Sequence, residues 1–144
     1  MKIKIKLTSS EARMPKRGSD EAAGYDICSL EEIEIKPLES VLIKTGLAFE
    51  IPKGYYLKVC PRGSMVMKKN LDMPHSVGIV DSDYRGELFV PLRNLSLKAP
   101  VIIEKGERIA QVILQKYEEM EFERFEKLSE TKRGNGKLGS TGKF

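Results

Sequence analysis

Apolar and polar residues alternate in several short runs of this chain. The alternation is clear over residues 2–7 and 32–36, and further apolar-rich runs cover residues 41–45, 47–51 and 55–60. A period of two residues is typical of β-strands that bury one face, and glycine or proline closes most of these runs. Because no helical period is present before residue 60, the pattern predicts an all-β sandwich or barrel.

Further strands are predicted over residues 89–97, 101–103 and 108–114. Alternation along the last of these puts Gln111 on a largely apolar face, where its amide needs a partner either in the core or in a ligand. Residues 117–125 mix charged and apolar positions, and we predict a last strand there, although a short helix would also fit.

One segment, residues 61–69, departs from the strand pattern. Its apolar residues and clustered lysines predict a single short helix that begins at Gly63 and Ser64. Ser64 before an apolar run is typical of a structural N-cap. Alternatively, the free N–H groups of the helix start suit a phosphate, to which Arg62 would add a bidentate donor.

Residues 78–88 carry two acids, a tyrosine and an Arg-Gly pair between apolar runs. This pattern predicts a β-hairpin with a polar tip. Asp81 directly follows Ile79 and Val80, so we expect its carboxylate at the end of a buried strand, partly desolvated and able to activate a water. Asp81 is therefore the candidate general base, and simple capping of the turn by Asp81 and Asp83 is the alternative.

Composition indicates one domain and a distinct C-terminal segment. The 144 residues include 12 Gly and 7 Pro, carry a net charge of +4, and suffice for a single core. The basic, glycine-rich end has too little apolar content to fold alone and suits a polyanion, either a nucleotide or a nucleic acid. We expect a β domain over residues 1–128 and a flexible C-terminal arm over residues 129–144.

Some sites and locations are disfavoured. No apolar run is long enough to span a membrane and no secretory segment begins the chain, so a cytoplasmic location is expected. Cys28 and Cys60 do not form a C-x-x-C pair, and with the single His75 they make a poor zinc site. Both cysteines are expected to be small buried fillers.

Five ordered stretches resemble the five motifs of the trimeric deoxyuridine triphosphatase (dUTPase) family and together span nearly the whole chain. They are residues 23–26, 61–64, 78–86, 106–111 and 133–142. The resemblance implies a jelly-roll-like β fold assembled as a homotrimer with active sites at subunit interfaces. Each site would take the second and fourth motifs from one subunit, the third from its neighbour and the arm from the remaining subunit.

The activity implied by the resemblance is hydrolysis of dUTP to dUMP and pyrophosphate through attack of water on the α-phosphate. Asp81 matches the aspartate that orients this water, and Tyr84 matches the tyrosine packed under the deoxyribose. Positions that match groups around the phosphates and their bound water and metal are Arg62, Gln111, Arg133, Ser140 and Thr141. The other expected substrate-binding positions are Gly63, Ser64, His75, Gly78, Ile79, Val80, Leu138 and Gly139.

The expected cofactor is Mg²⁺. The ion would bridge the phosphates and keep several waters, so it needs no dedicated protein cage. Asp26 and Gln111 are candidates for its outer shell. The expected partners are dUTP and further copies of the chain, with neither nucleic acid nor a membrane.

Departures from the family pattern suggest two other functions. Gly63 follows Arg62 where the family usually has Ser, and His75 stands where Asn is usual. Leu138 replaces an aromatic residue, and because stacking on a base is worth about 1–3 kcal/mol, weaker substrate binding is expected, partly offset by the charge of Lys137. The alternatives are a dCTP deaminase-like activity and a nucleotide-binding or interaction protein with reduced turnover.

Overall fold

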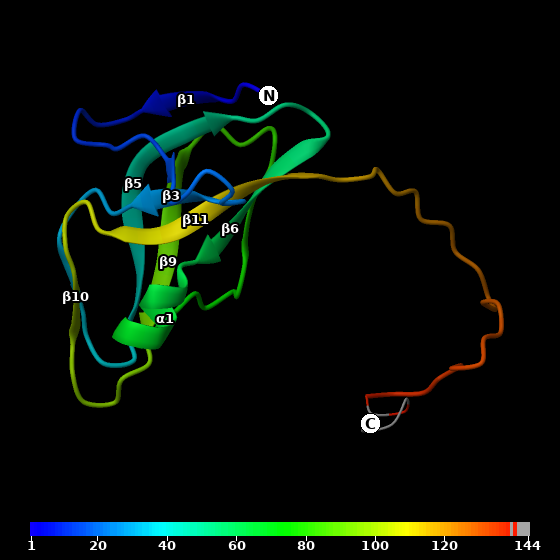
Figure 1. Ribbon diagram of the computed structural model, residues 1–144. Helices are drawn as coiled ribbons and strands as arrows, with labels where there is room; N and C mark the ends of the chain where they lie inside the picture. Colours follow the sequence, from blue (N-terminus) through cyan, green and yellow to red (C-terminus); the bar gives the residue numbers. More distant parts are fainter. Residues whose placement is uncertain (139, 141–144) are drawn as a thin grey trace.

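The computed structural model describes residues 1–138 and residue 140 (Figure 1). This part of the chain contains eleven strands and one helix. The strands are β1 (Lys4–Leu7), β2 (Lys16–Arg17), β3 (Tyr25–Cys28), β4 (Ile33–Ile35), β5 (Ser40–Glu50), β6 (Tyr55–Pro61), β7 (Leu71–Asp72), β8 (Gly78–Val80), β9 (Glu87–Asn94), β10 (Val101–Ile103) and β11 (Arg108–Lys116), and the helix is α1 (Gly63–Lys69). The prediction of an all-β fold with one short helix is confirmed.

Two antiparallel sheets supply one core. One sheet has the strand order β1-β5-β9-β7 and the other has the order β2-β3-β11-β6-β8, while β10 and β4 form a separate pair. Ile43 and Val90 from the first sheet are fully buried in the same cluster as Ile27 and Ile109 from the second. Each such side chain contributes about 1.5–3 kcal/mol when it leaves water, so this shared core holds the sheets together.

Strand β5 runs through Gly46, where the sequence predicted a strand end. Gly46 has a φ of +69°, and the pairing of β5 with β9 shifts register between Lys44 and Ala48. Glycine adopts positive φ without strain, so the chain makes a bulge and then continues as a strand. A second register shift, between Arg108 and Ala110 of β11, interrupts the predicted alternation of that strand.

The predicted hairpin over residues 78–88 is wrong. Strand β8 pairs with β6 in one sheet, whereas β9 pairs with β5 and β7 in the other. Alternation identifies a strand but does not identify its partner, and the two strands here belong to different layers. Residues 81–86 therefore form a turn that crosses from sheet to sheet, which we call the acidic turn.

Helix α1 begins as predicted at Gly63, but Ser64 is not its cap. Arg62 occupies the N-cap position with extended backbone angles, and no side chain caps the helix there. At the other end Asn70 adopts the left-handed conformation and donates its N–H to the carbonyl of Met65. Arg62 is thus placed at the junction of β6 and α1.

The last strand predicted over residues 117–125 is absent. Regular structure ends at Lys116, and the described chain after it runs away from the sheets (Figure 1). Every described residue from 115 onward is exposed. A strand needs a partner for its backbone groups, and in the described part of the chain only the first residue of this segment has one, since the Tyr117 N–H donates to the Gly54 carbonyl at 3.1 Å. Within the described part of the chain, no helix has the length and apolar character needed to cross a membrane.

Candidate active site

A carboxylate on β3 holds two arginines from other elements. Asp26 Oδ1 lies 3.1 Å from Arg62 Nε, and Asp26 Oδ2 accepts a hydrogen bond of 3.0 Å from Arg108 Nη1. The Asp26 side chain is only 12% exposed. Because charge-assisted bonds of this kind are strong and directional, the two guanidinium groups are held side by side.

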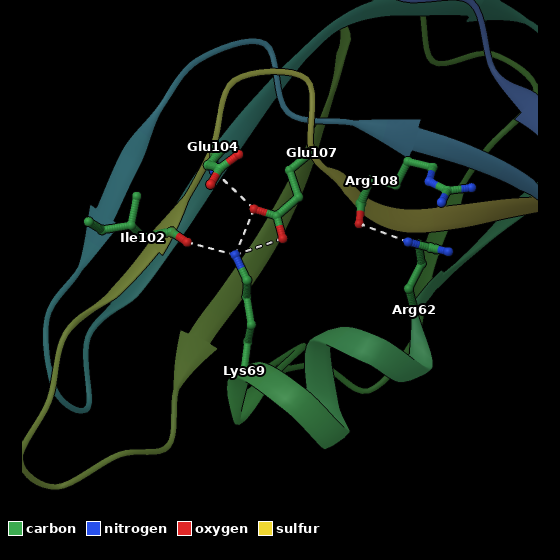
Figure 2. Close-up of polar contacts among 6 residues, drawn as sticks. All are labelled: Arg62, Lys69, Ile102, Glu104, Glu107 and Arg108. Atoms are coloured by element: carbon green, nitrogen blue, oxygen red, sulfur yellow. Dashed lines mark hydrogen bonds and ion pairs between the residues drawn. The ribbon is translucent and has the colours of Figure 1, made fainter.

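Helix α1 is tied at both ends to the segment around the β10–β11 turn (Figure 2). At its start, Arg62 Nη1 donates to the Arg108 carbonyl at 3.4 Å. At its end, Lys69 Nζ lies 2.7 Å from both carboxylate oxygens of Glu107 and donates to the Ile102 carbonyl at 2.8 Å. Glu107 also accepts the Glu104 N–H at 2.9 Å, which closes the turn.

These residues line a cleft of about 790 Å³, which we call the cationic cleft. Seven cationic side chains line it, namely Arg13, Lys16, Arg17, Arg62, Lys68, Lys69 and Arg108. Its two acidic side chains are Asp26 and Glu107. Arg62 and Ser64 were predicted from the sequence to lie in a phosphate site, and both line this cleft.

Sequence reasoning missed the roles of Lys69, Glu107 and Arg108. Arg108 follows the Gly106-Glu107 turn and lies three residues before Gln111, which is the one local signal that could have identified it. Glu107 lies in the same motif, residues 106–111, but no local signal links it to Lys69, since the pair joins positions 38 residues apart.

Gln111 lies opposite Asp26 in the pairing of β11 with β3. A methyl group added at Gly24 would approach Gln111 Oε1 to 2.5 Å, so the Gln111 side chain packs directly against the Gly24 backbone. Among the described residues, every buried side-chain nitrogen or oxygen has a hydrogen-bond partner. The Gln111 amide makes no side-chain hydrogen bond to those residues, so its atoms are not buried, and solvent or a ligand can reach them.

The acidic turn is exposed in the single chain, which corrects the expectation that Asp81 is partly desolvated. β8 is an edge strand whose Ile79 is 66% exposed, and Asp81 follows it into solvent. Tyr84 is 45% exposed, and its hydroxyl donates to the Glu87 carbonyl at 2.9 Å. A side chain at Gly86 would overlap the Tyr84 phenol, so glycine is needed for this ring position.

His75 lies against the start of β8. A methyl group at Gly78 would lie 3.3 Å from His75 Nε2 and 3.1 Å from Val59 Cβ. The His75 ring is exposed and follows a tight loop in which Ser76 has a φ of +62°. The expected base-contacting residues His75, Gly78 and Ile79 are therefore neighbours.

The acidic turn and the cationic cleft do not share a cavity in one subunit. Asp81 lines two other clefts, of about 750 and 250 Å³, and Tyr84 lines the smaller one together with Val80. No residue of these two clefts also lines the cationic cleft. The candidate base and the candidate phosphate ligands are thus assembled separately.

In the described part of the arm, hydrogen bonds join arm residues to one another, and Glu130 also pairs with Lys127 at 3.1 Å. Arg133 Nε donates to the Gly136 carbonyl at 3.3 Å, and Ser140 N–H donates to the Lys137 carbonyl at 3.0 Å. Leu138 is fully exposed. Gly139 and Thr141, two of the expected substrate-binding positions, lie outside the described residues.

Neither cysteine is fully buried, which corrects the prediction of two core fillers. Cys28 lines the cationic cleft, and burial raises the pKa of its thiol above the ordinary value. Over residues 1–138 and 140, no group of three or more His, Cys, Asp or Glu side chains could hold a metal ion. A divalent ion would therefore need phosphate oxygens or waters for most of its ligands.

Known proteins match nearly the whole length of the chain. The dUTPase family model matches residues 10–142. Deoxyuridine 5'-triphosphate nucleotidohydrolase of Nautilia profundicola is 46% identical over 143 residues, covering 99% of this chain and 100% of that protein. The Helicobacter pylori protein of the same name is 42% identical, with 99% and 97% covered.

Solved structures agree in fold. A mutant dUTPase of Staphylococcus bacteriophage 80alpha with dUpNHpp gives a TM-score of 0.87 at 30% identity, covering 98% of each chain. A mutant dUTPase from phage phi11 of S. aureus, which carries a structural Mg(II) ion, gives a TM-score of 0.83 at 25% identity, covering 90% of this chain and 100% of that one. Because the family model matches residues 10–142 and relatives of 46% and 42% identity cover nearly the whole chain, this chain belongs to the dUTPase family.

Proposed function

We propose that this chain hydrolyses dUTP to dUMP and pyrophosphate in active sites shared between the subunits of a homotrimer. The proposal rests on one observation: the expected phosphate ligand Arg62 and the expected base Asp81 line separate clefts of the single chain. Among the described residues, the carboxylates that line the cationic cleft are Asp26 and Glu107, both already ion-paired, while Asp81 is exposed on the acidic turn in clefts whose only cationic lining residue is Lys53. A neighbouring subunit can bring the two halves together.

In the proposed mechanism Asp81 orients a water for in-line attack on the α-phosphate and accepts its proton. Its exposure in the single chain supports this role, because a base must be reachable by both water and substrate. Arg62, the Gln111 amide and the N–H groups of Gly63 and Ser64 hold the phosphates. Arg62 offsets the charge that develops on the departing pyrophosphate.

Selection of the sugar and the base is proposed for the acidic turn and the strand before it. The exposed Tyr84 ring, held by its bond to the Glu87 carbonyl, would pack under deoxyribose and leave no space for a 2'-hydroxyl. Main-chain groups of Gly78, Ile79 and Val80, with His75 beside them, would recognise uracil. A site that hydrogen-bonds its base rejects a wrong one by about 10⁴-fold or more.

Mg²⁺ is proposed as the cofactor, held chiefly by the phosphates and water. The chemistry of the adjacent donors fits, since Asp26 and Gln111 are register partners whose oxygens suit hydrogen bonds from metal-bound water. When bound, the ion would neutralise part of the negative charge of the triphosphate. Asp26 itself is already compensated by Arg62 and Arg108, so it suits an outer-shell position better than direct ligation.

The proposed role of the arm, residues 129–144, is to close over an active site of another subunit and exclude water. Arg133, Leu138, Gly139, Ser140 and Thr141 would contact the nucleotide there. The segment before the arm supports an intersubunit position, because Met120, Phe122 and Phe125 are 73%, 90% and 65% exposed. Clustered exposed apolar residues favour contact with another surface.

The test is pyrophosphate release from dUTP with Mg²⁺, run beside UTP and the other deoxynucleoside triphosphates, with light scattering to count subunits. We expect release from dUTP alone and a trimeric mass. Ammonia release from dCTP would favour the deaminase alternative. Tight dUTP binding without pyrophosphate would favour the nucleotide-binding alternative and reject the proposed activity.

A further inference from the structure

The cationic cleft has more positive charge than its acids balance. Both of its carboxylates are already engaged, Asp26 by Arg62 and Arg108, and Glu107 by Lys69. Four of its cations take part in no ion pair among residues 1–138 and 140; they are Arg13, Lys16, Arg17 and Lys68. All four are exposed, and we call them the cationic rim.

Independent parts of the fold hold the rim beside Arg62. Lys16 and Arg17 form the edge strand β2, in which Lys16 lies opposite Asp26. Arg13 Nη1 donates to the Gly106 carbonyl at 3.2 Å, and Lys68 belongs to α1. Like charges in one cleft repel each other, so this arrangement lowers the stability of the folded chain unless a bound anion offsets the repulsion.

We propose that the cationic rim captures the triphosphate of the incoming nucleotide and passes it to Arg62. The inference rests on the proposed function. A cleft lined by charge of one sign raises the local concentration of an oppositely charged ligand and its association rate by about 10–10³-fold. A triphosphate carries more charge than a nucleoside monophosphate, so the rim attracts the substrate dUTP more than the product dUMP.

The shape of the site favours a nucleotide over a nucleic acid. The rim surrounds one hollow of about 790 Å³, a size typical of a small-molecule site, and does not extend along the surface as a stripe. Its members lie on the loop before β2, on β2 and on α1, around the same hollow that Arg62 lines. A compact polyanion can reach all four.

The test compares two triple variants with wild type. Lys16→Gln/Arg17→Gln/Lys68→Gln removes three rim charges and keeps Arg13, whose bond to Gly106 also supports the turn. The matched control, Lys36→Gln/Lys44→Gln/Lys98→Gln, removes the same charge from exposed lysines that do not line the cleft. The quantities measured are kcat and kcat/KM for dUTP between about 0.01 and 0.15 M ionic strength, over which the Debye length falls from about 30 to 8 Å.

We expect the rim variant to lose about 10-fold or more in kcat/KM at low ionic strength, with a much smaller change in kcat and a flatter salt dependence. The control should match wild type. Equal kcat/KM and equal salt dependence in the rim variant and wild type would overturn the proposal. If the triple variant unfolds, Lys16→Gln/Arg17→Gln and Lys68→Gln, which lie on separate elements, are each expected to show part of the loss.

The role of the cationic rim can still be tested if the proposed dUTP hydrolysis is wrong. If wild type hydrolyses no dUTP, calorimetric binding of dUTP and inorganic triphosphate still tests the rim, and unchanged affinity in the rim variant overturns it. A labelled single-stranded oligothymidine is measured in parallel. Tighter, rim-dependent binding of that oligonucleotide than of dUTP would identify a nucleic-acid surface and overturn capture of the nucleotide.

Discussion

The cationic cleft and the acidic turn, the two halves of the proposed active site, are built in opposite ways. In the cleft, β3, α1 and β11 are tied together by partly buried ion pairs around Asp26, whose side chain is 12% exposed. The acidic turn is one short crossing between sheets, held by local contacts such as the bond from Tyr84 to the Glu87 carbonyl. Asp81 itself is exposed.

The difference follows from what each half must do. Guanidinium groups that receive phosphates need fixed positions before the substrate arrives, and compensation by Asp26 limits the repulsion between Arg62 and Arg108. A general base needs access to water, so it gains from staying uncompensated until the site is assembled. The cleft is therefore formed by contacts within the chain, while under the proposed function the acidic turn would be completed by a neighbouring subunit.

Replacing the base should have the largest effect. Asp81→Asn keeps the size of the side chain but removes its ability to accept a proton, so we expect turnover to fall by about 10²-fold or more while dUTP binding and the melting temperature stay near wild type. Asp83→Asn, an exposed acid two residues later, is the matched control and should retain turnover. Unchanged turnover in Asp81→Asn would reject Asp81 as the base.

Removal of the arm comes next. Deleting residues 133–144 should leave less than about a tenth of the dUTP hydrolysis, because Arg133 and the closure that excludes water are lost. The β domain should melt as in wild type, since the described residues of this segment bond within it or to Thr131 just before it and not to the sheets. Steady-state kinetics and calorimetry of the truncated chain check both points, and full activity would restrict the arm to a solvated tail.

How far the sequence predicts the fold depends on the range of the interaction. Period-two alternation and turn residues correctly located β4, β6 and β10, and the apolar segment after Arg62 correctly located α1. These are local properties. Alternation could not show that β8 and β9 pair in different sheets, because the choice of partner is set by the whole core.

The same limit applies to the site. Arg62, Gln111, Asp81 and Tyr84 could be identified as candidates from their motifs, but the ion pair that joins Arg62 to Asp26 spans 36 positions and leaves no local pattern. Asp81 was expected to be partly desolvated but is exposed in the single chain. An apolar run before it does not show whether its strand lies inside a sheet or at the edge, and β8 lies at the edge. Gly46 was mistaken for a strand end because its positive φ belongs to a bulge, after which β5 continues.

A smaller effect is expected from filling the space beside Tyr84. Gly86→Ala places a methyl group where the phenol lies, so the ring must move and its bond to the Glu87 carbonyl is lost. We expect the preference for dUTP over UTP, measured as the ratio of kcat/KM values, to fall by about 10-fold, the scale of a misfitted group in a pocket. Gly18→Ala, with no atom nearer than 3.9 Å, is the control, and an equal loss of preference in both variants would remove Tyr84 from sugar selection.

The smallest effect is expected from the tie between α1 and the β10–β11 turn. Lys69→Met and Glu107→Gln each break an ion pair whose side chains are 28% and 20% exposed. The pair is partly solvated, so its loss should lower the free energy of unfolding by about 1 kcal/mol, measured by urea unfolding. The loosened helix should also raise KM for dUTP a few-fold, because Arg62 begins that helix, with little change in kcat.

A double-mutant cycle separates this tie from general damage. If Lys69 and Glu107 act through each other, the double variant should be little worse than either single variant in both KM and stability. Glu104→Gln is the matched control, because Glu104 contributes its backbone N–H to Glu107 and that bond survives the substitution. Additive effects would mean that the two residues act independently, and the position of Arg62 would then depend on Asp26 and the Arg108 carbonyl without help from the far end of α1.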